Sequence, residues 1–210
     1  MQIHSNDFRD GAPIPAVLAF GQPGSAGEAC VLSANRSPHL AWSGAPAATR
    51  SFVITCIDID VPSRGDDVNQ AGRTVPESLP RVEFVHWLIA NIGPEVHELA
   101  QGACADGIVA RGKAAPPGPS GSVQGCNDYT GWFATDADMA GRYLGYDGPC
   151  PPWNDALVHR YCFSVHALDV ARLDLAPGFD LAQLRAALQG HVLATATLTG
   201  TYTLNPALRG

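Results

Sequence analysis

Two stretches of the chain, residues 51–57 and 82–91, are nearly continuously apolar and rich in β-branched and aromatic side chains. Such runs are typical of strands that are covered on both faces, because a strand with one face in water alternates apolar and polar residues. We therefore expect both to be central strands of a sheet. Residues 161–168 form a third run of this kind, and threonine alternates with apolar residues along residues 194–202, which predicts a fourth strand.

Glycine and proline divide the rest of the chain into short segments. The 22 glycines and 17 prolines fit an antiparallel sandwich better than alternating strand and helix units. With 210 residues, of which 46% are apolar, the chain can bury a substantial core, and it contains neither a repeat nor a linker. The sequence therefore predicts a mainly β protein, an antiparallel β-sandwich folded as a single domain over residues 1–210, with long polar loops at residues 61–80 and 112–125.

One helix is predicted between Asp180 and Gly190. Asp180 can cap its first turn, Gln183 stands three residues later as in a capping box, and Gly190 suits the position after the last turn. Residues 136–140 are a second, shorter helical candidate, which Gly141 limits. The helical apolar stripe of the first helix consists of Leu181, Leu184 and Leu188.

The net charge of −7 argues against a general binder of nucleic acid or anionic membranes, since clustered Lys and Arg supply most of that affinity. Any site for a phosphate must therefore be local. No run of 18 apolar residues exists, and the first residues lack the basic and apolar regions of a signal peptide. We expect a cytoplasmic protein without integral membrane association.

The six cysteines are spread along the chain, and no Cys-x-x-Cys pair occurs, so we expect reduced thiols and no structural zinc. Cys56 and Cys162 lie in apolar runs and are interpreted as small core residues. Cys150 lies in a proline-rich turn, where either a structural role or a reactive thiol fits. The remaining three are Cys30, Cys104 and Cys126.

Four short motifs carry the polar chemistry. The first, residues 58–62, reads Asp-Ile-Asp-Val-Pro, and the second is His86 between Val85 and Trp87. The third, residues 148–152, reads Gly-Pro-Cys-Pro-Pro, and it leads to the fourth, His159-Arg160-Tyr161. Most of them join a strand-like run to a proline- or glycine-rich turn, where a rigid scaffold can present polar groups to a ligand. If folding brings them together, they form an anion-binding pocket.

Carboxylates and imidazoles in such a pocket change each other's pKa. An Asp that accepts an N–H from an imidazole raises the pKa of that ring and favours the imidazolium, which can hold a phosphate or carboxylate. His86 and His159 are the candidates for this role. Asp58 and Asp60 would share a face in an ideal strand, but the turn at Pro62 can redirect one of them. Backbone N–H groups around Gly148 and Cys150 are further candidate donors, because consecutive exposed amides form concavities that bind anions.

In this order, the motifs resemble those of the phosphatidylethanolamine-binding protein family, in particular its bacterial branch related to Raf kinase inhibitor protein. The resemblance covers nearly the whole chain, from residues 37–42 through 190–194 to 200–202. It implies a β-sandwich with a few short flanking helices and a small pocket for phosphate-like head groups. The pocket residues that it implies are Asp58, His86, His159, Tyr161 and the turn Cys150-Pro151-Pro152, with Asp60 in the same motif.

The chain also departs from the family pattern near this pocket. Ile59 stands where the family often has Pro, Val61 stands where Ala is common, and the segment between Pro152 and His159 is longer than in eukaryotic members. The resemblance further implies that the Val61–Pro62 peptide is a candidate for the cis form.

Each motif also has a structural interpretation. Asp58 could cap a turn, and His86 and His159 could be hydrogen-bonded core histidines. Arg160 is expected to make a salt bridge or to cover a face of the sheet, because alternation points it away from His159 and Tyr161. Residues 127–132 fit a turn with an aromatic anchor, or alternatively the rim of the pocket.

Three functions remain as hypotheses. The first is a protein that binds a small anionic or phosphate-bearing ligand, without a cofactor or metal, although two Asp and two His are also a conceivable ligand set for a divalent cation. The second is an enzyme in which Asp58 and His86 act as a general acid–base pair. The third, by family analogy alone, is a regulatory protein that inhibits a kinase or protease partner. The family also suggests a homodimer, with residues 61–80 at its interface.

Overall fold

The computed structural model describes residues 1–25 and 27–209. Long strands dominate it, joined by loops and by short helices. The elements in chain order are β1 (Gln2–His4), η1 (Ala16–Leu18), β2 (Gly21–Gln22), β3 (Val31–Leu32), β4 (Leu40–Ser43), β5 (Ser51–Pro62), β6 (Arg81–Ile92), β7 (Glu98–Leu99), β8 (Val123–Gln124), α1 (Tyr129–Trp132), β9 (His159–Leu168), α2 (Leu181–Leu188), β10 (Val192–Tyr202) and η2 (Pro206–Leu208).

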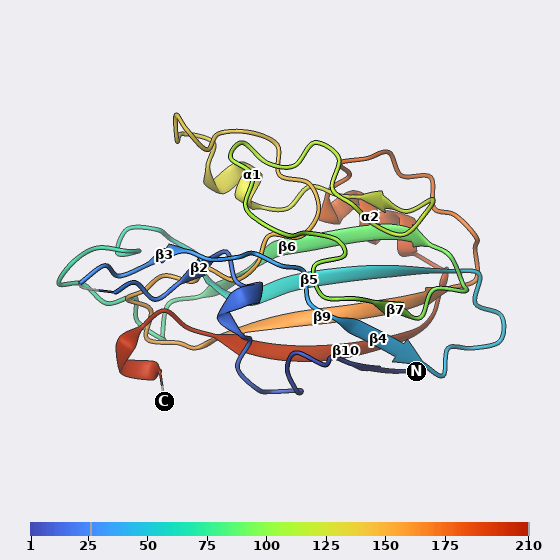
Figure 1. The fold of residues 1–210 in the computed structure, drawn as a ribbon, viewed down its shortest axis with the longest axis horizontal. Helices are drawn as coiled ribbons and strands as arrows, with labels where there is room; N and C mark the ends of the chain where they lie inside the picture. Colours follow the sequence, from blue (N-terminus) through green and yellow to red (C-terminus); the bar gives the residue numbers. More distant parts are fainter. Residues whose placement is uncertain (26, 210) are drawn as a thin grey trace.

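The larger sheet contains five strands in the order β10-β9-β5-β6-β8, and all neighbouring strands are antiparallel (Figure 1). The four strands predicted from the sequence are its four long strands. The register places Cys56 of β5 opposite Phe163 of β9 on one side and opposite Trp87 of β6 on the other. β5 runs on to Pro62, five residues past the predicted end at residue 57.

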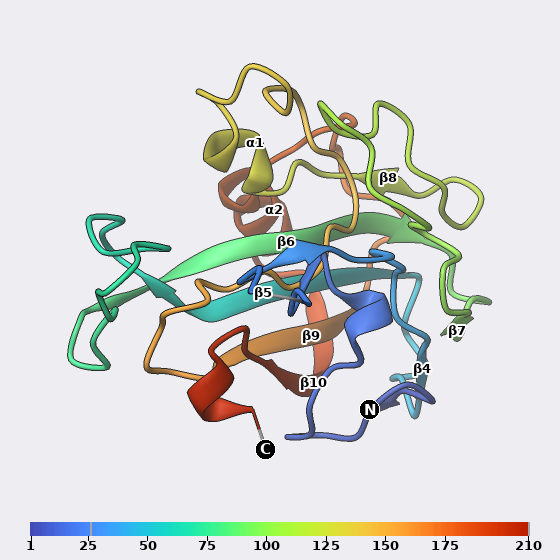
Figure 2. The same cartoon turned by 60° about the vertical axis from the view of Figure 1, so that its left-hand side comes forward.

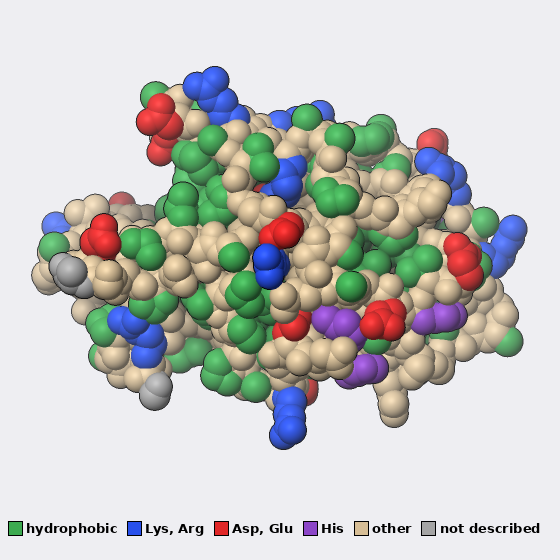
Figure 3. Space-filling model, viewed as in Figure 1, with side chains coloured by type: hydrophobic (Ala, Val, Ile, Leu, Met, Phe, Trp, Pro, Cys, Tyr) green, Lys and Arg blue, Asp and Glu red, His purple; other side chains and the backbone are tan. Residues whose placement is uncertain are grey.

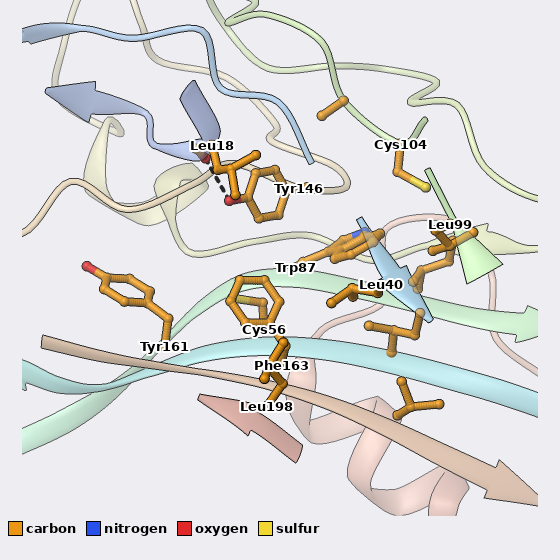
Figure 4. Close-up of a cluster of buried hydrophobic side chains, with 14 of the residues drawn as sticks. Leu18, Leu40, Cys56, Trp87, Leu99, Cys104, Tyr146, Tyr161, Phe163 and Leu198 are labelled. Carbon is orange, nitrogen blue, oxygen red and sulfur yellow. Dashed lines mark hydrogen bonds between the residues drawn. The ribbon is translucent and has the colours of Figure 1, made fainter. Parts of the chain in front are cut away.

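A smaller sheet, in the order β1-β4-β7, forms the second layer, and β2 and β3 make a separate two-stranded ribbon. The main core contains residues of both layers, including Trp42 of β4, Phe52 of β5 and Phe163 of β9. Figure 4 shows part of this core, where the Tyr146 hydroxyl donates a hydrogen bond to the carbonyl oxygen of Leu18. The predicted mainly β antiparallel sandwich is confirmed.

The other face of the large sheet is covered by α2. Leu184 of α2 is fully buried and packs in a second cluster with Val53 of β5 and Leu88 of β6. In Figure 2 both α-helices lie above β6, whereas β4 and the N-terminus lie at the lower right. Because both faces of the central strands are covered, these strands are apolar along nearly their whole length.

The prediction for α2 is confirmed in detail. Asp180 Oδ1 accepts a hydrogen bond from the Gln183 backbone N–H at 2.8 Å, and Gln183 Oε1 accepts one from the Asp180 backbone N–H at 2.9 Å. These bonds satisfy N–H groups that the helix itself leaves free. Gly190 follows with a φ of +79°, which a residue with a Cβ rarely adopts.

The prediction of a helix at residues 136–140 is wrong. The segment consists of turns, and the short helix α1 ends before it. Asp136 Oδ1 accepts hydrogen bonds from the backbone N–H groups of Asp138 and Met139, each at 2.9 Å. An Asp side chain that binds nearby backbone in this way competes with helix formation.

The loop at residues 61–80 is held at its centre by one side chain. Asn154 Nδ2 donates to the carbonyl oxygens of Asp67, Gln70 and Arg73, and Asn154 Oδ1 accepts from the N–H of Asn69. These four bonds replace the backbone pairing that a strand would supply.

Three further predictions concern the backbone and the surface. The Val61–Pro62 bond is trans, as is every other peptide bond in the described part of the chain. The predicted loop 112–125 contains the short strand β8 at its end. Among residues 1–25 and 27–209, no helix has the length and apolar content needed to cross a membrane. On the face shown in Figure 3, Lys and Arg side chains stand singly among Asp and Glu.

Candidate functional site

A pocket of about 330 Å³ lies where β5, β6 and β9 meet the turn at residues 149–152, the start of the 61–80 loop and α1. A volume of this size suits a small ligand. Seven of the nine predicted site residues line it, and Asp60 and Gly148 do not. Its lining consists of Phe20, Leu32, Asp58, Val61, Pro62, Ser63, Arg64, Gly65, Val68, Asn69, Phe84, His86, Tyr129, Trp132, Phe133, Cys150, Pro151, Pro152, His159 and Tyr161.

Strand register brings these distant residues together. Asp58 of β5 pairs with Tyr161 of β9 on one side and with Phe84 of β6 on the other. His86 lines the same pocket as Phe84, and the centroids of their two rings lie 5.0 Å apart. The antiparallel pairing thus places the early acidic motif beside two motifs that come much later in the chain.

His159 is bound at both ring nitrogens by carboxylates. Its Nδ1 lies 2.7 Å from Asp58 Oδ2, and its Nε2 lies 3.1 Å from Asp155 Oδ2. Burial opposes the charged ring, but the hydrogen bonds to Asp155 and Asp58 outweigh burial and raise the pKa of His159 to about 9. The imidazolium therefore donates both N–H groups inside the protein and has none left for a ligand.

Arg81 completes this charged chain. Its Nη1 and Nη2 donate to the two carboxylate oxygens of Asp155 at 2.6 and 3.0 Å, in the bidentate geometry that suits a guanidinium. Two carboxylates, of Asp58 and Asp155, are thus matched by two cations, His159 and Arg81. These four side chains, of which Asp58 and His159 line the pocket, form its floor, and their charges sum to zero.

His86 has the opposite protonation state from the one predicted. Its Nδ1 lies 2.7 Å from the carbonyl oxygen of Asp147, which only accepts, so Nδ1 carries the proton. The ring is almost fully buried, and burial lowers its pKa, although Asp58 and the Asp147 carbonyl act in the other direction. The prediction of a raised pKa is wrong for His86, because burial outweighs the charge of Asp58 and the hydrogen bond to the Asp147 carbonyl. The neutral ring has Nε2 as a hydrogen-bond acceptor.

Tyr161 contributes a buried hydroxyl to the same wall. Among residues 1–25 and 27–209, this hydroxyl has no hydrogen-bond partner. Figure 4 shows the phenol ring directed away from the other labelled core side chains. Burial and, after it, the nearby Asp58 carboxylate raise the pKa of Tyr161 well above its usual value, so the hydroxyl stays protonated and can donate.

Asp60 points away from the pocket. The pairing of β5 with β6 is irregular between Asp58 and Val61, and Asp58 Oδ1 accepts a hydrogen bond from the Asp60 N–H at 2.8 Å. Asp60 instead binds the Arg160 guanidinium through Nε at 2.9 Å and Nη2 at 2.8 Å. The predicted salt bridge of Arg160 is confirmed, and Asp60 joins β5 to β9 rather than lining the pocket.

Gly148 supports the turn rather than a ligand. Its N–H donates to Asn35 Oδ1 at 2.8 Å, so it does not serve as the anion donor expected from the sequence. A Cβ at this position would lie 2.1 Å from the carbonyl oxygen of Leu18 and 2.8 Å from the Tyr146 hydroxyl. The close approach of these atoms explains the glycine.

Sequence reasoning missed the groups that hold His86 and His159. Asp147 receives hydrogen bonds from Lys113 Nζ at 2.5 Å, Asn35 Nδ2 at 2.7 Å and Asn127 Nδ2 at 2.8 Å, and this network fixes the carbonyl that binds His86. Its members lie far apart in sequence and share no motif. For Asp155 the sequence offered one indication that it could contact His159: the two residues are only four positions apart.

The walls above the polar floor are aromatic. Phe20 stacks on Tyr129 with ring centroids 4.6 Å apart, and Phe84 meets Tyr129 edge-on at 5.3 Å. Trp132 and Phe133 complete the wall. Both sequence interpretations of residues 127–132 fit in part: Tyr129 and Trp132 line the pocket, and Asn127 Oδ1 accepts a hydrogen bond from the Tyr129 N–H in a turn that leads into the helix α1.

One uncompensated cation lies at the mouth. Arg64 lines the pocket and makes no ion pair within the described part of the chain. No three His, Cys, Asp or Glu side chains among the described residues are grouped so as to hold a metal ion.

Known proteins match this chain over nearly its whole length. The family model for phosphatidylethanolamine-binding protein matches residues 4–203. The UPF0098 protein YbhB of Escherichia coli K12 is 33% identical over 96% of this chain and 99% of its own length. A UPF0098 protein of Chlamydia muridarum is 33% identical over 96% of this chain and 98% of its own length.

Solved structures give the same result. The crystal structure of E. coli YbcL superposes with a TM-score of 0.68 at 29% identity, covering 96% of this chain and 97% of that chain. The homologue CT736 of Chlamydia trachomatis superposes with a TM-score of 0.64 at 30% identity, covering 96% and 95%. The chain belongs to the phosphatidylethanolamine-binding protein family and, within it, to the bacterial branch.

Proposed function

We propose that the pocket binds a small phosphate-bearing ligand through Tyr161, His86 and Arg64. The observation that carries this proposal is the Tyr161 hydroxyl, which is buried, lines the pocket and has no hydrogen-bond partner among the described residues. A buried donor without a partner costs roughly 1–3 kcal/mol, and a ligand oxygen would remove that cost.

The charges of the floor are compatible with an anion. Asp58 would repel a phosphate if its charge were free, but His159 binds it at 2.7 Å. The second carboxylate, Asp155, is bound by Arg81. Each of the two carboxylates is thus paired with a cation. Arg64, at the pocket mouth, is a cation without a carboxylate partner among the described residues, and it can attract an anion there.

The aromatic walls favour an ester over free phosphate. Phe20, Phe84 and Phe133 offer apolar surface directly above the polar floor. A ligand with a phosphate at one end and carbon atoms at the other would satisfy both regions, as in most small-molecule sites. Inorganic phosphate would use only the polar part and should bind more weakly.

Calorimetry with phosphoethanolamine and with inorganic phosphate tests the proposal. Tyr161→Phe removes only the unpartnered hydroxyl, and His86→Ala removes the neighbouring imidazole. Both variants should lose at least about tenfold in affinity, the value of one hydrogen bond to a charged group.

Matched controls separate binding from folding. Tyr146→Phe removes a hydroxyl that donates to Leu18 at 2.7 Å and lies outside the pocket lining. His166→Ala removes a histidine of β9 that contacts Thr195. Both controls should retain full affinity. Undiminished affinity in both Tyr161→Phe and His86→Ala would refute the site.

A second candidate function is acid–base catalysis, and the state of His86 favours it. A neutral imidazole whose Nδ1–H is held by a carbonyl presents Nε2 as a base. The pair proposed from the sequence changes, because Asp58 binds His159 rather than His86. Turnover of phosphomonoesters that disappears in His86→Ala would support this candidate, and binding without turnover would argue against it.

The resemblance also leads us to propose a regulatory role through protein partners and a homodimer. The exposed side chains of Leu32 and Trp132 at the pocket mouth offer apolar surface for a contact. Light scattering at micromolar concentration tests the dimer. A pull-down from cell extract, with Trp132→Ser as the comparison, tests the partner.

A further inference from the structure

We propose that Cys30 and Cys150 form a reversible disulfide when the protein reacts with a hydroperoxide. The six cysteines are free thiols in the structure, as predicted from the sequence, but the sequence contained no signal that two of them meet. The Sγ atoms of Cys30 and Cys150 lie 3.9 Å apart, although 120 residues separate them in the chain. This distance is a thiol–thiol contact, and a disulfide requires about 2.05 Å.

The surrounding backbone makes room for this contact. Gly21 of β2 lies against both sulfurs, and a Cβ there would stand 2.5 Å from Cys150 Sγ and 2.8 Å from Cys30 Sγ. The N–H groups of Phe20 and Gly21 donate to the carbonyl oxygen of Pro149 at 2.9 and 3.1 Å. These bonds fix the turn that carries Cys150 against β2, while Cys30 sits just before β3 on the return strand of the same ribbon.

The pKa values of the two thiols shift in opposite directions, and this difference assigns which thiol attacks the peroxide. The contact with the Cys150 thiol lowers the pKa of Cys30 to about 7, with a further contribution from the Gln22 backbone, against the effect of burial. The same contact and burial raise the pKa of Cys150 well above its usual value. Both thiols are half-buried, so exposure does not separate them; the lower pKa makes Cys30 the nucleophile and leaves Cys150 as the resolving thiol.

The reaction proceeds in two steps. The Cys30 thiolate attacks one peroxide oxygen, so that the S–O bond forms, the O–O bond breaks, and the leaving hydroxide takes up a proton as water. The Cys150 thiol then loses its proton and attacks the Cys30 sulfur, so that the S–S bond forms and the S–O bond breaks, releasing a second water. In sum, two thiols are oxidised to one disulfide while hydrogen peroxide is reduced to two waters.

The disulfide would join the β2–β3 ribbon to a wall of the pocket. Cys150 lines the pocket directly and is followed by Pro151 and Pro152, which line it too. Closing the gap between the sulfurs must move one of the two segments, and the hydrogen-bonded turn is the better anchored. We therefore assign the movement to Cys30 and to Leu32, which lines the mouth of the pocket.

Peptide mapping without reduction tests the proposal on the full chain. Trypsin cuts after Lys and Arg and leaves the six cysteines in six separate peptides, with Cys30 in residues 10–36 and Cys150 in residues 143–160. After treatment with hydrogen peroxide, these two peptides should appear as one cross-linked species that is two hydrogens lighter than their sum. Dithiothreitol should restore the separate peptides.

Three variants assign the roles. In Cys150→Ser, Cys30 should stop at the sulfenic acid and be labelled by dimedone. In Cys30→Ser, Cys150 should remain a thiol. The control Cys162→Ser changes a half-buried thiol on β9 outside the pocket lining, and it should form the cross-link as the wild type does. A wild-type protein that forms no cross-link between residues 10–36 and 143–160, or that joins other cysteines equally well, would overturn the proposal.

Discussion

The imidazole of His86 meets the phenol ring of Tyr161 edge-on, with ring centroids 5.1 Å apart and an interplanar angle of 69°. One of these groups offers an acceptor nitrogen and the other offers a hydroxyl that has no partner among the described residues. The two groups are therefore adjacent, and together they suit a ligand that donates one hydrogen bond to His86 Nε2 and accepts one from the Tyr161 hydroxyl. A singly protonated phosphate is such a ligand.

Tyr161→Phe should separate stability from binding. Its hydroxyl is buried without a partner, so its removal should leave the free energy of unfolding unchanged or raise it by about 1 kcal/mol. Tyr146→Phe, which loses a hydrogen bond to Leu18, should lower the same quantity by about 1 kcal/mol. Urea unfolding measures both. A clear loss of stability in Tyr161→Phe would mean that its hydroxyl is bonded in the folded protein.

Anion binding should be coupled to proton uptake by His86. Burial lowers the pKa of His86, so the ring is neutral in the free protein at pH 7. A bound anion favours the imidazolium, so affinity should rise as the pH falls from 8 to 6, by at most about tenfold per pH unit. Sulfate is the suitable probe because its charge does not change in this range.

Calorimetry of sulfate binding in two buffers of different ionisation enthalpy counts the protons. We expect net uptake in the wild type and none in His86→Gln, whose amide can donate at every pH. Uptake that persists in His86→Gln would assign the proton to another group facing the pocket, with Asp58, His159 and Tyr161 as the candidates.

His159 should make the stability of the protein fall at alkaline pH. Its pKa is raised to about 9 from an unfolded value of 6.5, so its stabilising effect is complete below pH 6.5 and is lost as the pH rises through 9. The loss is on the order of 3 kcal/mol, because the two pKa values differ by roughly 2.5 and each pKa unit corresponds to about 1.4 kcal/mol.

Urea unfolding at pH 6.5 and 8.5 tests this effect, and the comparison with His159→Gln cancels the contribution of other groups that titrate in this range, such as Cys30. His159→Gln keeps one side-chain donor near Asp58 but cannot gain a charge. The variant should be less stable at pH 6.5 and should lack most of the wild-type slope between the two pH values. Equal slopes in the two proteins would contradict the assignment.

The strands and α2 could be predicted because their signals are local. The apolar runs of β5 and β6 reflect burial on both faces, and Asp180 and Gln183 form a capping box within four residues. The failure at residues 136–140 has a local cause as well. Asp136 can bind the backbone of a turn or begin a helix, and its sequence context does not decide between them.

The site could be predicted only in part, because its residues were recognisable but their partners were not. Asp58, His86 and Tyr161 belong to motifs, whereas the carbonyl that holds His86 belongs to a residue 61 positions away. The protonation state of His86 follows from that contact and from burial, and neither is local in sequence. The same is true of the Cys30–Cys150 contact.

Gly148→Ala should be strongly destabilising. The new Cβ would lie 2.1 Å from the Leu18 carbonyl oxygen, a backbone atom that cannot move away without disturbing η1. We expect a loss of at least about 2 kcal/mol, in the range of overpacked core positions. Gly131→Ala in α1 is the control, because a Cβ there meets nothing within 4 Å, and the change should be neutral or stabilising. Thermal unfolding of both variants measures the difference.

Asn154→Ala should release the loop that forms one side of the pocket. The amide makes four hydrogen bonds to the backbone of residues 67–73, and all four are lost in the variant. We expect a loss of about 2–3 kcal/mol, less than the sum of four separate bonds because water replaces some of them. Trypsin should then cut faster after Arg64 and Arg73, which lie within this loop.

Asn205→Ala is the matched control, because its amide donates to the Asp155 carbonyl outside the loop. Equal cleavage rates in the two variants would show that contacts other than Asn154 hold the loop. Faster cleavage in Asn154→Ala with weaker binding of phosphoethanolamine would show that this loop shapes the pocket.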